Sequence, residues 1–292
     1  MTDTTLATTD GRTLGFADYG PSDGIPVLWF HGGPGSRLEP KATAPAAAAL
    51  GFRLVGIDRP GYGLSTPRPG RTIASVVPDA LAVADTLGID AFYAVGVSTG
   101  GAYALATAAI VPDRVRGVVA CCALTDLRND DVKRQLLAMS DWSKIFEASS
   151  RDEAMELAAG QFGADGSLLL NPTAMENQNI ALAPRDMELF LDPAFLVGML
   201  ESAPAMFTFG VEGYADDRLA DGPGWGSFDV DAVRCPVVVL HGEADTVCPV
   251  INAYATADIV PNAELHITTD DGHFSIVGHV PEVLAEMAKG EA

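Results

Sequence analysis

The stretch AVGVSTGGAYALA (residues 94–106) joins an apolar run typical of a buried strand to an Ala-rich helical pattern, with Ser98 at the junction. Gly96, Gly100 and Gly101 surround the serine, although glycine weakens strands and helices alike. Such glycines are expected where the backbone turns tightly and tolerates little side-chain bulk. The stretch therefore predicts a strand, a sharp turn that carries Ser98, and a helix.

Residues 96–100 match the pattern G-x-S-x-G, which in this context forms a nucleophile elbow. The turn holds the serine out at the carboxyl end of the sheet, next to a helix N-terminus whose dipole favours a developing anion. A Gly-rich turn with an incidental serine is the alternative, and the flanking strand and helix favour the elbow. Ser98 is therefore predicted to be a nucleophile.

A serine hydroxyl needs a base to activate it, and the base needs an acid to orient it. In this type of fold the three follow the chain order Ser, Asp or Glu, His. His273 lies in TTDDGHFS after the last expected strand, and Asp245 lies in VVVLHGEADTVCP after the strand before it. Asp126, which follows an earlier strand, is the rival acid. Asp245 is the preferred choice, at the carboxyl end of the strand that precedes the strand of His273.

Acyl chemistry also needs hydrogen-bond donors for an oxyanion. One is expected to be the backbone N–H of Thr99, directly after the nucleophile, and the other an N–H in the loop at residues 31–35. Gly33 is the first choice in that loop and Gly32 the second, since Pro34 has no N–H. His31 is interpreted as a residue that stabilises the turn.

Elsewhere strands and helices alternate. The N-terminal region reads as a hairpin at 5–20, and strands are expected at 25–32, 52–58, 91–97, 115–124, 235–243 and 263–269. Helical patterns lie between them, near 37–50, 72–87, 100–110, 247–258 and 275–288. This alternation predicts an α/β fold with a mostly parallel eight-stranded sheet flanked by helices.

The alternation stops between residues 126 and 227, where the pattern is helical or loop-like. The predicted core therefore comprises residues 1–125 and 228–292, and the middle segment is predicted to be an inserted helical cap. Six of the eight methionines lie in this segment. Methionine-rich linings adapt to irregular apolar ligands, so the cap is expected to cover a mainly apolar pocket.

Charge and composition narrow the expected partners. The net charge of −21 disfavours nucleic acid and anionic membranes, which leaves a small-molecule substrate. The N-terminal residues lack a signal-peptide pattern, and no apolar run reaches the roughly 18 residues of a membrane span. The cysteines are expected to be buried thiols in a reducing cytoplasm: Cys121, Cys122, Cys235 and Cys248. Their spacing predicts no metal site, and no organic cofactor is expected; the sequence does not indicate the oligomeric state.

Five stretches together resemble the α/β-hydrolase superfamily: WFHGGPGS (29–36), DRPGYGLS (58–65), GVSTGGAYALA (96–106), LHGEADTVCP (240–249) and DGHFS (271–275). The HGGPG loop also resembles proline iminopeptidases, which usually carry tryptophan where Thr99 stands. The resemblance implies a serine hydrolase that cleaves an ester, thioester or lactone of a small apolar substrate through an acyl-enzyme. The alternatives are an acyltransferase or aminopeptidase on the same triad, or a non-catalytic ligand-binding protein on a hydrolase fold.

Overall fold

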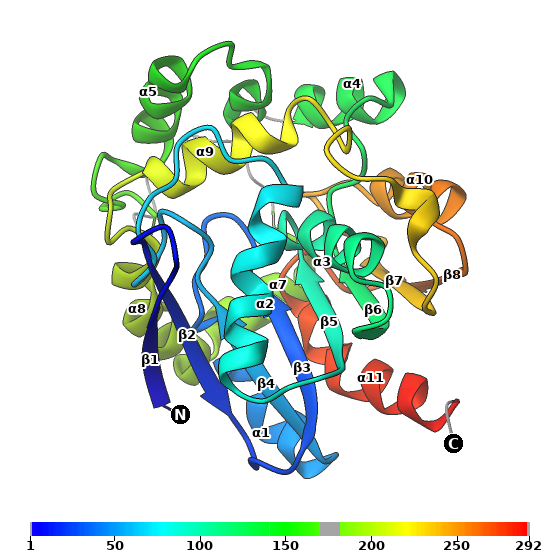
Figure 1. Ribbon diagram of the computed structural model, residues 1–292. Helices are drawn as coiled ribbons and strands as arrows, with labels where there is room; N and C mark the ends of the chain where they lie inside the picture. Colours follow the sequence, from blue (N-terminus) through cyan, green and yellow to red (C-terminus); the bar gives the residue numbers. More distant parts are fainter. Residues whose placement is uncertain (1, 140, 170–181, 291–292) are drawn as a thin grey trace.

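The computed structural model describes residues 2–139, 141–169 and 182–290 (Figure 1). Eight strands form one sheet in the order β1-β2-β4-β3-β5-β6-β7-β8. Only the pairs β1–β2 and β2–β4 are antiparallel, so the expected fold class is confirmed. The strands are β1 (Thr2–Ala7), β2 (Thr13–Tyr19), β3 (Ile25–Phe30), β4 (Phe52–Ile57), β5 (Phe92–Val97), β6 (Val115–Cys121), β7 (Val237–Gly242) and β8 (Ala263–Thr268).

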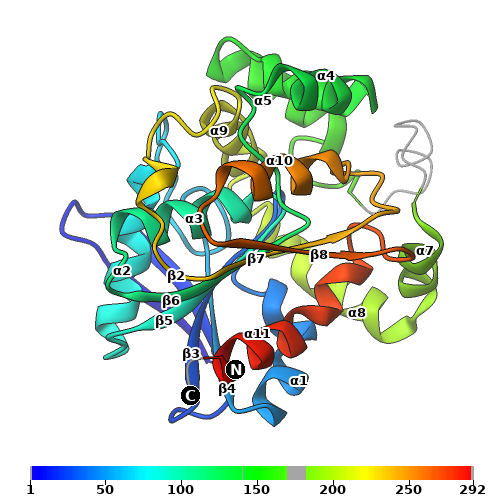
Figure 2. The ribbon, with the colours of Figure 1, turned by 90° about the vertical axis from the view of Figure 1, so that its right-hand side faces the viewer.

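Helices cover both faces of the sheet (Figure 2). One face carries α1 (Ala44–Ala49) and α11 (Val280–Lys289), and the other carries α2 (Val77–Thr86), α3 (Gly100–Ile110) and α10 (Ile251–Ile259). Short 3-10 helices complete the core: η1 (Glu39–Ala42), η2 (Ala74–Val76), η4 (Val230–Ala232) and η5 (Ser275–His279).

The central strands are buried on both faces, which explains why they are apolar without interruption. In β3, Leu28 and Phe30 pack into one hydrophobic cluster while Val27 and Trp29 pack into the other. Each of these side chains is at most 1% exposed. Complete burial of one such side chain contributes roughly 1.5–3 kcal/mol, so the two clusters hold the sheet and its strand ends in place.

The strand expected over 115–124 ends earlier, at Cys121. Cys122 takes a positive φ of 40°, a left-handed conformation that an extended strand cannot continue through. Its N–H donates to Leu240 O on β7 at 2.8 Å. The two adjacent cysteines therefore do not alternate along one strand, although both are buried free thiols as expected.

The described part of residues 126–227 contains helices and no strand. They are α4 (Asp130–Met139), η3 (Asp141–Glu147), α5 (Arg151–Phe162), α7 (Pro184–Leu191), α8 (Pro193–Met206) and α9 (Glu212–Asp221). In Figure 1, α4, α5 and α9 gather above the sheet. The methionines differ in their environment: Met206 is buried and Met187 is half exposed, while Met175 lies outside the described residues. The boundaries of a cap at 126 and 227 stay a prediction.

Within the described ranges, no single helix is long and apolar enough to cross a membrane. Helices α7 and α8 satisfy the length and composition test only as a pair, and a bend of 82° separates them.

Candidate active site

Ser98 occupies the sharp turn between β5 and α3 with a positive φ of 52°. The glycines around it allow very close packing. A Cβ on Gly96 would lie 2.3 Å from the Gly100 carbonyl oxygen, and a Cβ on Gly100 would lie 2.0 Å from the Phe30 carbonyl oxygen. No side chain fits at either position, so the glycines are required by the tight turn that presents a half-buried Ser98 at the N-terminus of α3.

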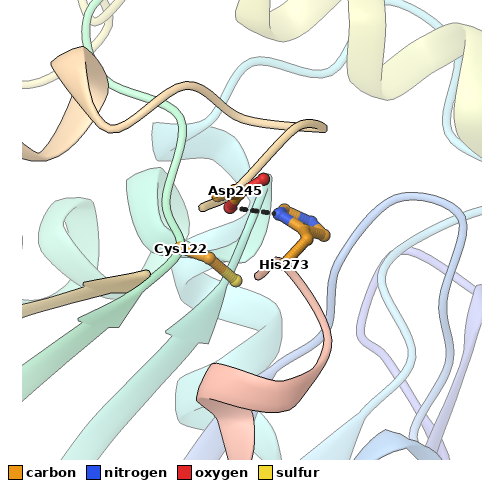
Figure 3. Close-up of side chains that lie close together, drawn as sticks. All are labelled: Cys122, Asp245 and His273. Atoms are coloured by element: carbon orange, nitrogen blue, oxygen red, sulfur yellow. Dashed lines mark hydrogen bonds and ion pairs between the residues drawn. The ribbon is translucent and has the colours of Figure 1, made fainter. Parts of the chain in front are cut away.

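Asp245 and His273 form a buried hydrogen-bonded pair (Figure 3). Asp245 follows β7, His273 follows β8, and His273 Nδ1 lies 2.8 Å from Asp245 Oδ2. The other carboxylate oxygen accepts hydrogen bonds from Val247 N and Cys248 N, each at 2.8 Å. These backbone donors hold the carboxylate in one orientation, and the carboxylate in turn orients the imidazole.

The electrostatics of the pair favour a charged carboxylate and a basic imidazole. Burial opposes ionisation of Asp245, but the imidazoles of His273 and His241 hold its pKa well below the usual range. Burial likewise opposes protonation of His273, yet the Asp245 carboxylate raises its pKa well above the usual value. The imidazolium form of His273 is therefore stabilised by a carboxylate that stays ionised.

Two further residues contact this pair. His241 Nε2 lies 3.3 Å from Asp245 Oδ2 and 2.9 Å from Cys248 O, so this histidine supports the acid. Cys122 places its thiol beside both partners (Figure 3), and donor atoms of Cys122, Asp245 and His273 all lie within 4.8 Å of one another. Burial raises the pKa of the Cys122 thiol, which is therefore neutral.

The rival acid, Asp126, has other partners. Arg128 Nε donates to its Oδ2 at 2.8 Å, and Trp225 N donates to its Oδ1 at 3.0 Å. Burial opposes ionisation of Asp126, but hydrogen bonds from Arg128 lower the pKa of its carboxyl. The structure thus joins His273 to Asp245 and uses Asp126 in the connection between β6 and residues near 225.

The loop that carries His273 is anchored by a residue that sequence reasoning missed. Asp186, fully buried on α7, accepts hydrogen bonds from Phe274 N at 3.1 Å and Ser275 N at 2.8 Å. These N–H groups open η5, where helix geometry leaves backbone donors without partners. Nothing in the sequence near residue 186 signals this contact, because it links positions 88 and 89 residues apart.

In the loop at residues 31–35, here called the oxyanion loop, the N–H groups of Gly32 and Gly33 differ in their hydrogen bonding. Gly32 N donates to Glu39 Oε1 at 2.9 Å, while Trp29 Nε1 donates to the other oxygen of Glu39 at 2.6 Å. The Gly32 N–H is therefore already engaged. Among the described residues, the N–H groups of Gly33 and Thr99 have no hydrogen-bond partner. A Cβ on Gly33 would lie 3.0 Å from Thr99 Oγ1, so the two predicted donor residues are neighbours.

His31 stabilises this loop, as the sequence indicated. Its Nε2 accepts from Arg59 N at 3.2 Å, and its Nδ1 lies 2.6 Å from Gly32 O. Burial lowers the pKa of His31 well below its usual value, so the ring is neutral. These contacts assign the proton to Nδ1, which donates to Gly32 O.

Ser98 and His273 both follow strands whose carboxyl ends meet at one edge of the parallel sheet. Within the described chain no hydrogen bond joins the Ser98 hydroxyl to the imidazole. Catalytic hydrogen bonds are often long without substrate and tighten when it binds. The arrangement can activate a serine hydroxyl if His273 Nε2 reaches it in the complex with substrate.

Comparisons with known proteins agree with the observed fold. A family model described as alpha/beta hydrolase fold matches residues 25–280. A non-heme chloroperoxidase from Streptomyces lividans is 27% identical, covering 96% of each chain. A proline iminopeptidase from Neisseria gonorrhoeae is 26% identical, covering 86% of this chain and 83% of the relative. The crystal structure of a thermophilic esterase from Thermogutta terrifontis aligns with a TM-score of 0.72 at 23% identity, covering 99% of both chains.

Proposed function

Because this chain belongs to the α/β-hydrolase family and is an enzyme of the carboxylic ester hydrolase kind, we propose that it cleaves an ester, thioester or lactone through an acyl-enzyme on Ser98. Ser98 Oγ attacks the acyl carbon and its proton passes to His273 Nε2. The same proton then passes to the departing alcohol or thiol as the acyl bond breaks. Water repeats the sequence on the acyl-enzyme, which releases the acid and restores Ser98.

The observation that carries this proposal is the buried 2.8 Å hydrogen bond between His273 Nδ1 and Asp245 Oδ2 at the edge of the sheet where Ser98 lies. It fixes the tautomer in which Nε2 is free to accept a proton. The N–H groups of Gly33 and Thr99 are the proposed oxyanion donors. The engagement of Gly32 N by Glu39 supports Gly33 over Gly32.

The substrate is proposed to be small and mainly apolar, with helices of the cap over Ser98. Six methionines in residues 126–227 and a net charge of −21 support this choice, because polyanions are repelled and flexible thioethers fit irregular apolar groups. Each methylene buried in such a pocket adds about 0.8 kcal/mol of binding. Charged acyl groups gain none of this contribution.

We expect kcat/KM to rise a few-fold with each added CH₂ over short acyl chains, and to level off where the pocket is filled. A series of p-nitrophenyl esters from acetate to octanoate measures this dependence. A succinyl half-ester is the matched control for charge and should be a poor substrate. A flat profile, or preference for the half-ester, would contradict the apolar pocket.

The pH dependence of kcat/KM reports the base. His273 accepts a proton only while neutral, so activity rises with pH through its pKa. Because Asp245 raises that pKa, the ascending limb should lie above the ordinary histidine value of about 6.5. The measurement is kcat/KM against pH, with circular dichroism to confirm that the protein stays folded.

A control variant distinguishes titration of His273 from titration of a buried carboxyl, Asp221, as the cause of the ascending limb. Burial raises the pKa of Asp221 to about 7, in the same pH region. The limb should therefore persist at the same pH in Asp221→Asn. A limb that disappears in Asp221→Asn would exclude His273 as the titrating base, and a wild-type limb below the ordinary histidine value of about 6.5 would contradict the expected effect of Asp245 on the pKa of His273.

A further inference from the structure

Helix α9 buries charged side chains that would ordinarily face solvent. Eight of its ten residues are buried, among them Asp217 and Arg218, which are at most 2% exposed. Burial of charge is unfavourable unless each charge finds partners. The partners of Asp217 lie on the connection after β4 and on α3, and Arg218 contacts Thr99, a proposed oxyanion donor.

Asp217 accepts hydrogen bonds from three groups of the core and forms an ion pair with a fourth, Arg71. Arg59 Nη2 lies 2.8 Å from its Oδ2 and Arg71 Nη2 lies 2.9 Å from its Oδ1. The hydroxyls of Tyr62 and Tyr103 donate to the same carboxylate at 2.7 and 3.0 Å. Burial opposes ionisation, but the two guanidinium groups hold the pKa of Asp217 well below its usual range. Asp217 is therefore a fixed anion that ties α9 to the core.

Arg59 passes this constraint to the oxyanion loop. Its Nη1 donates to His31 O, and its Nη2 donates to Gly32 O at 2.8 Å. The Gly32 carbonyl and the Gly33 N–H belong to one peptide group. In a trans peptide the carbonyl and the N–H point in opposite directions. By holding Gly32 O, Arg59 aims the Gly33 N–H away from itself.

Arg218 contacts the other side of the proposed oxyanion site. Its Nη2 donates to Thr99 Oγ1 and would lie 3.0 Å from a Cβ on Gly33. Asp221 Oδ2 lies 2.8 Å from the same nitrogen, and the guanidinium stacks on the rings of Phe146 and Tyr214. Burial opposes the charge, but Asp221 raises the pKa of Arg218, which stays cationic.

The buried charged groups that join α9 to the core around Gly33 and Thr99 comprise three arginines and two aspartates. Arg59, Arg71 and Arg218 are cations, Asp217 is an anion, and Asp221 is partly protonated near neutral pH because burial raises its pKa to about 7. A chain with a net charge of −21 thus buries the Arg218 guanidinium next to Gly33 and Thr99, and the Arg59 guanidinium on Gly32 O. Buried, preorganised positive charge stabilises an anion far more than the same charge in water.

We propose that Asp217 and Arg218 of α9 are positioning residues for the oxyanion site: Asp217 orients the Gly32–Gly33 peptide through Arg59, and Arg218 holds Thr99 and stabilises the anion electrostatically. The inference rests on the proposed function, because it assigns the oxyanion to Gly33 and Thr99. Its consequence is that α9 is part of the catalytic apparatus, whereas a simple lid only covers the substrate.

Arg218→Met keeps the stacking volume and removes the charge and the hydrogen bond. We expect kcat on p-nitrophenyl butyrate to fall by about 10- to 100-fold with little change in KM, because the lost interaction forms with the anion only in the transition state. Arg218→Lys should recover part of the loss. Thr99→Val should lower kcat as well, and the double variant should lose less than the product of the two single losses.

A second readout isolates the oxyanion. Ser98 Oγ adds to the carbonyl carbon of an alkyl trifluoromethyl ketone, and the serine proton passes to His273. The former carbonyl oxygen then carries the negative charge in the oxyanion site. The affinity of the ketone should fall in Arg218→Met by the same factor as kcat. Arg151→Met is the matched control. Arg151 on α5 pairs with Asp216 and Glu212 of α9, and neither contact involves the loop at residues 31–35. This control should keep the wild-type kcat and inhibitor affinity.

The outcomes separate this inference from the proposed function. Wild-type turnover and labelling of Ser98 by a fluorophosphonate, together with unchanged kcat in Arg218→Met, would overturn the role of Arg218 alone. A fall in kcat of Arg218→Met without weaker ketone binding, or an equal fall in kcat of Arg151→Met, would assign Arg218 a purely structural role. Either result would also overturn its proposed role at the oxyanion site. If Arg218→Met fails to fold, Arg218→Lys and Thr99→Val decide by the same criteria. A wild type without esterase activity or labelling at Ser98 would overturn both proposals.

Discussion

Ser98→Ala is expected to lose nearly all esterase turnover, by about 10³-fold or more. The methyl group cannot attack the acyl carbon, and the oxyanion donors and binding alone retain only a small residual rate. The fold should survive, because alanine removes one half-buried hydroxyl at a position where the positive φ is already set by the turn. The measurement is kcat on p-nitrophenyl butyrate, with a thermal melt to verify folding.

Covalent labelling makes this result specific to the nucleophile. A fluorophosphonate that reacts with activated serines should label the wild type once, at Ser98, and should leave Ser98→Ala unlabelled. Equal labelling of both proteins would identify another nucleophile and contradict the proposed acyl-enzyme. Full turnover in the unlabelled variant would exclude covalent catalysis at this position.

Asp245→Asn is expected to lower kcat by about 10³- to 10⁴-fold, because an amide neither holds His273 in the required tautomer nor stabilises its cationic form. Asparagine has nearly the same shape, and its side-chain oxygen can still accept from Val247 N and Cys248 N. The loss should therefore arise in the chemical step. The pH profile and a thermal melt of the variant accompany the rate measurement.

Asp126→Asn is the matched comparison. Asp126 is a buried carboxylate after β6, and its partners are Arg128 and Trp225 N. Its replacement should lower stability without a comparable loss of turnover in the protein that remains folded. If Asp126→Asn lost more turnover than Asp245→Asn, the acid would follow the earlier strand, and the 2.8 Å contact of Asp245 with His273 would have another purpose.

Local patterns in the sequence determined the fold class. Apolar runs form the central strands, which are buried on both faces, and the glycines around Ser98 are required by backbone approaches as short as 2.0 Å. Candidate site residues could also be predicted where each follows its own strand. Parallel strands bring their carboxyl ends to one edge, so the sequence predicts Ser98, His273 and an acid there, while the contact of His273 with Asp245 distinguishes this acid from Asp126.

Element boundaries were less predictable, because single residues decide them. The apolar run at 115–124 continues past the end of β6, where Cys122 turns into a left-handed conformation to meet β7. Composition cannot show this turn, since a residue with a Cβ rarely adopts a left-handed conformation and cysteine gives no sign of it. The same turn places the Cys122 thiol against Asp245 and His273, a contact that the adjacent cysteines did not suggest.

Only the tertiary structure decided which donor and which charges belong to the candidate site. Gly32 and Gly33 are equivalent in sequence, and a contact with Glu39 engages one N–H and leaves the other. The run YADDRLAD in α9 has the composition of a solvated helix, yet packing buries Asp217 and Arg218 against groups up to 158 residues away. Sequence periodicity reports whether a helix has an apolar face. Whether a charged face is buried depends on partners brought from distant segments, because only their opposite charges and hydrogen bonds offset desolvation.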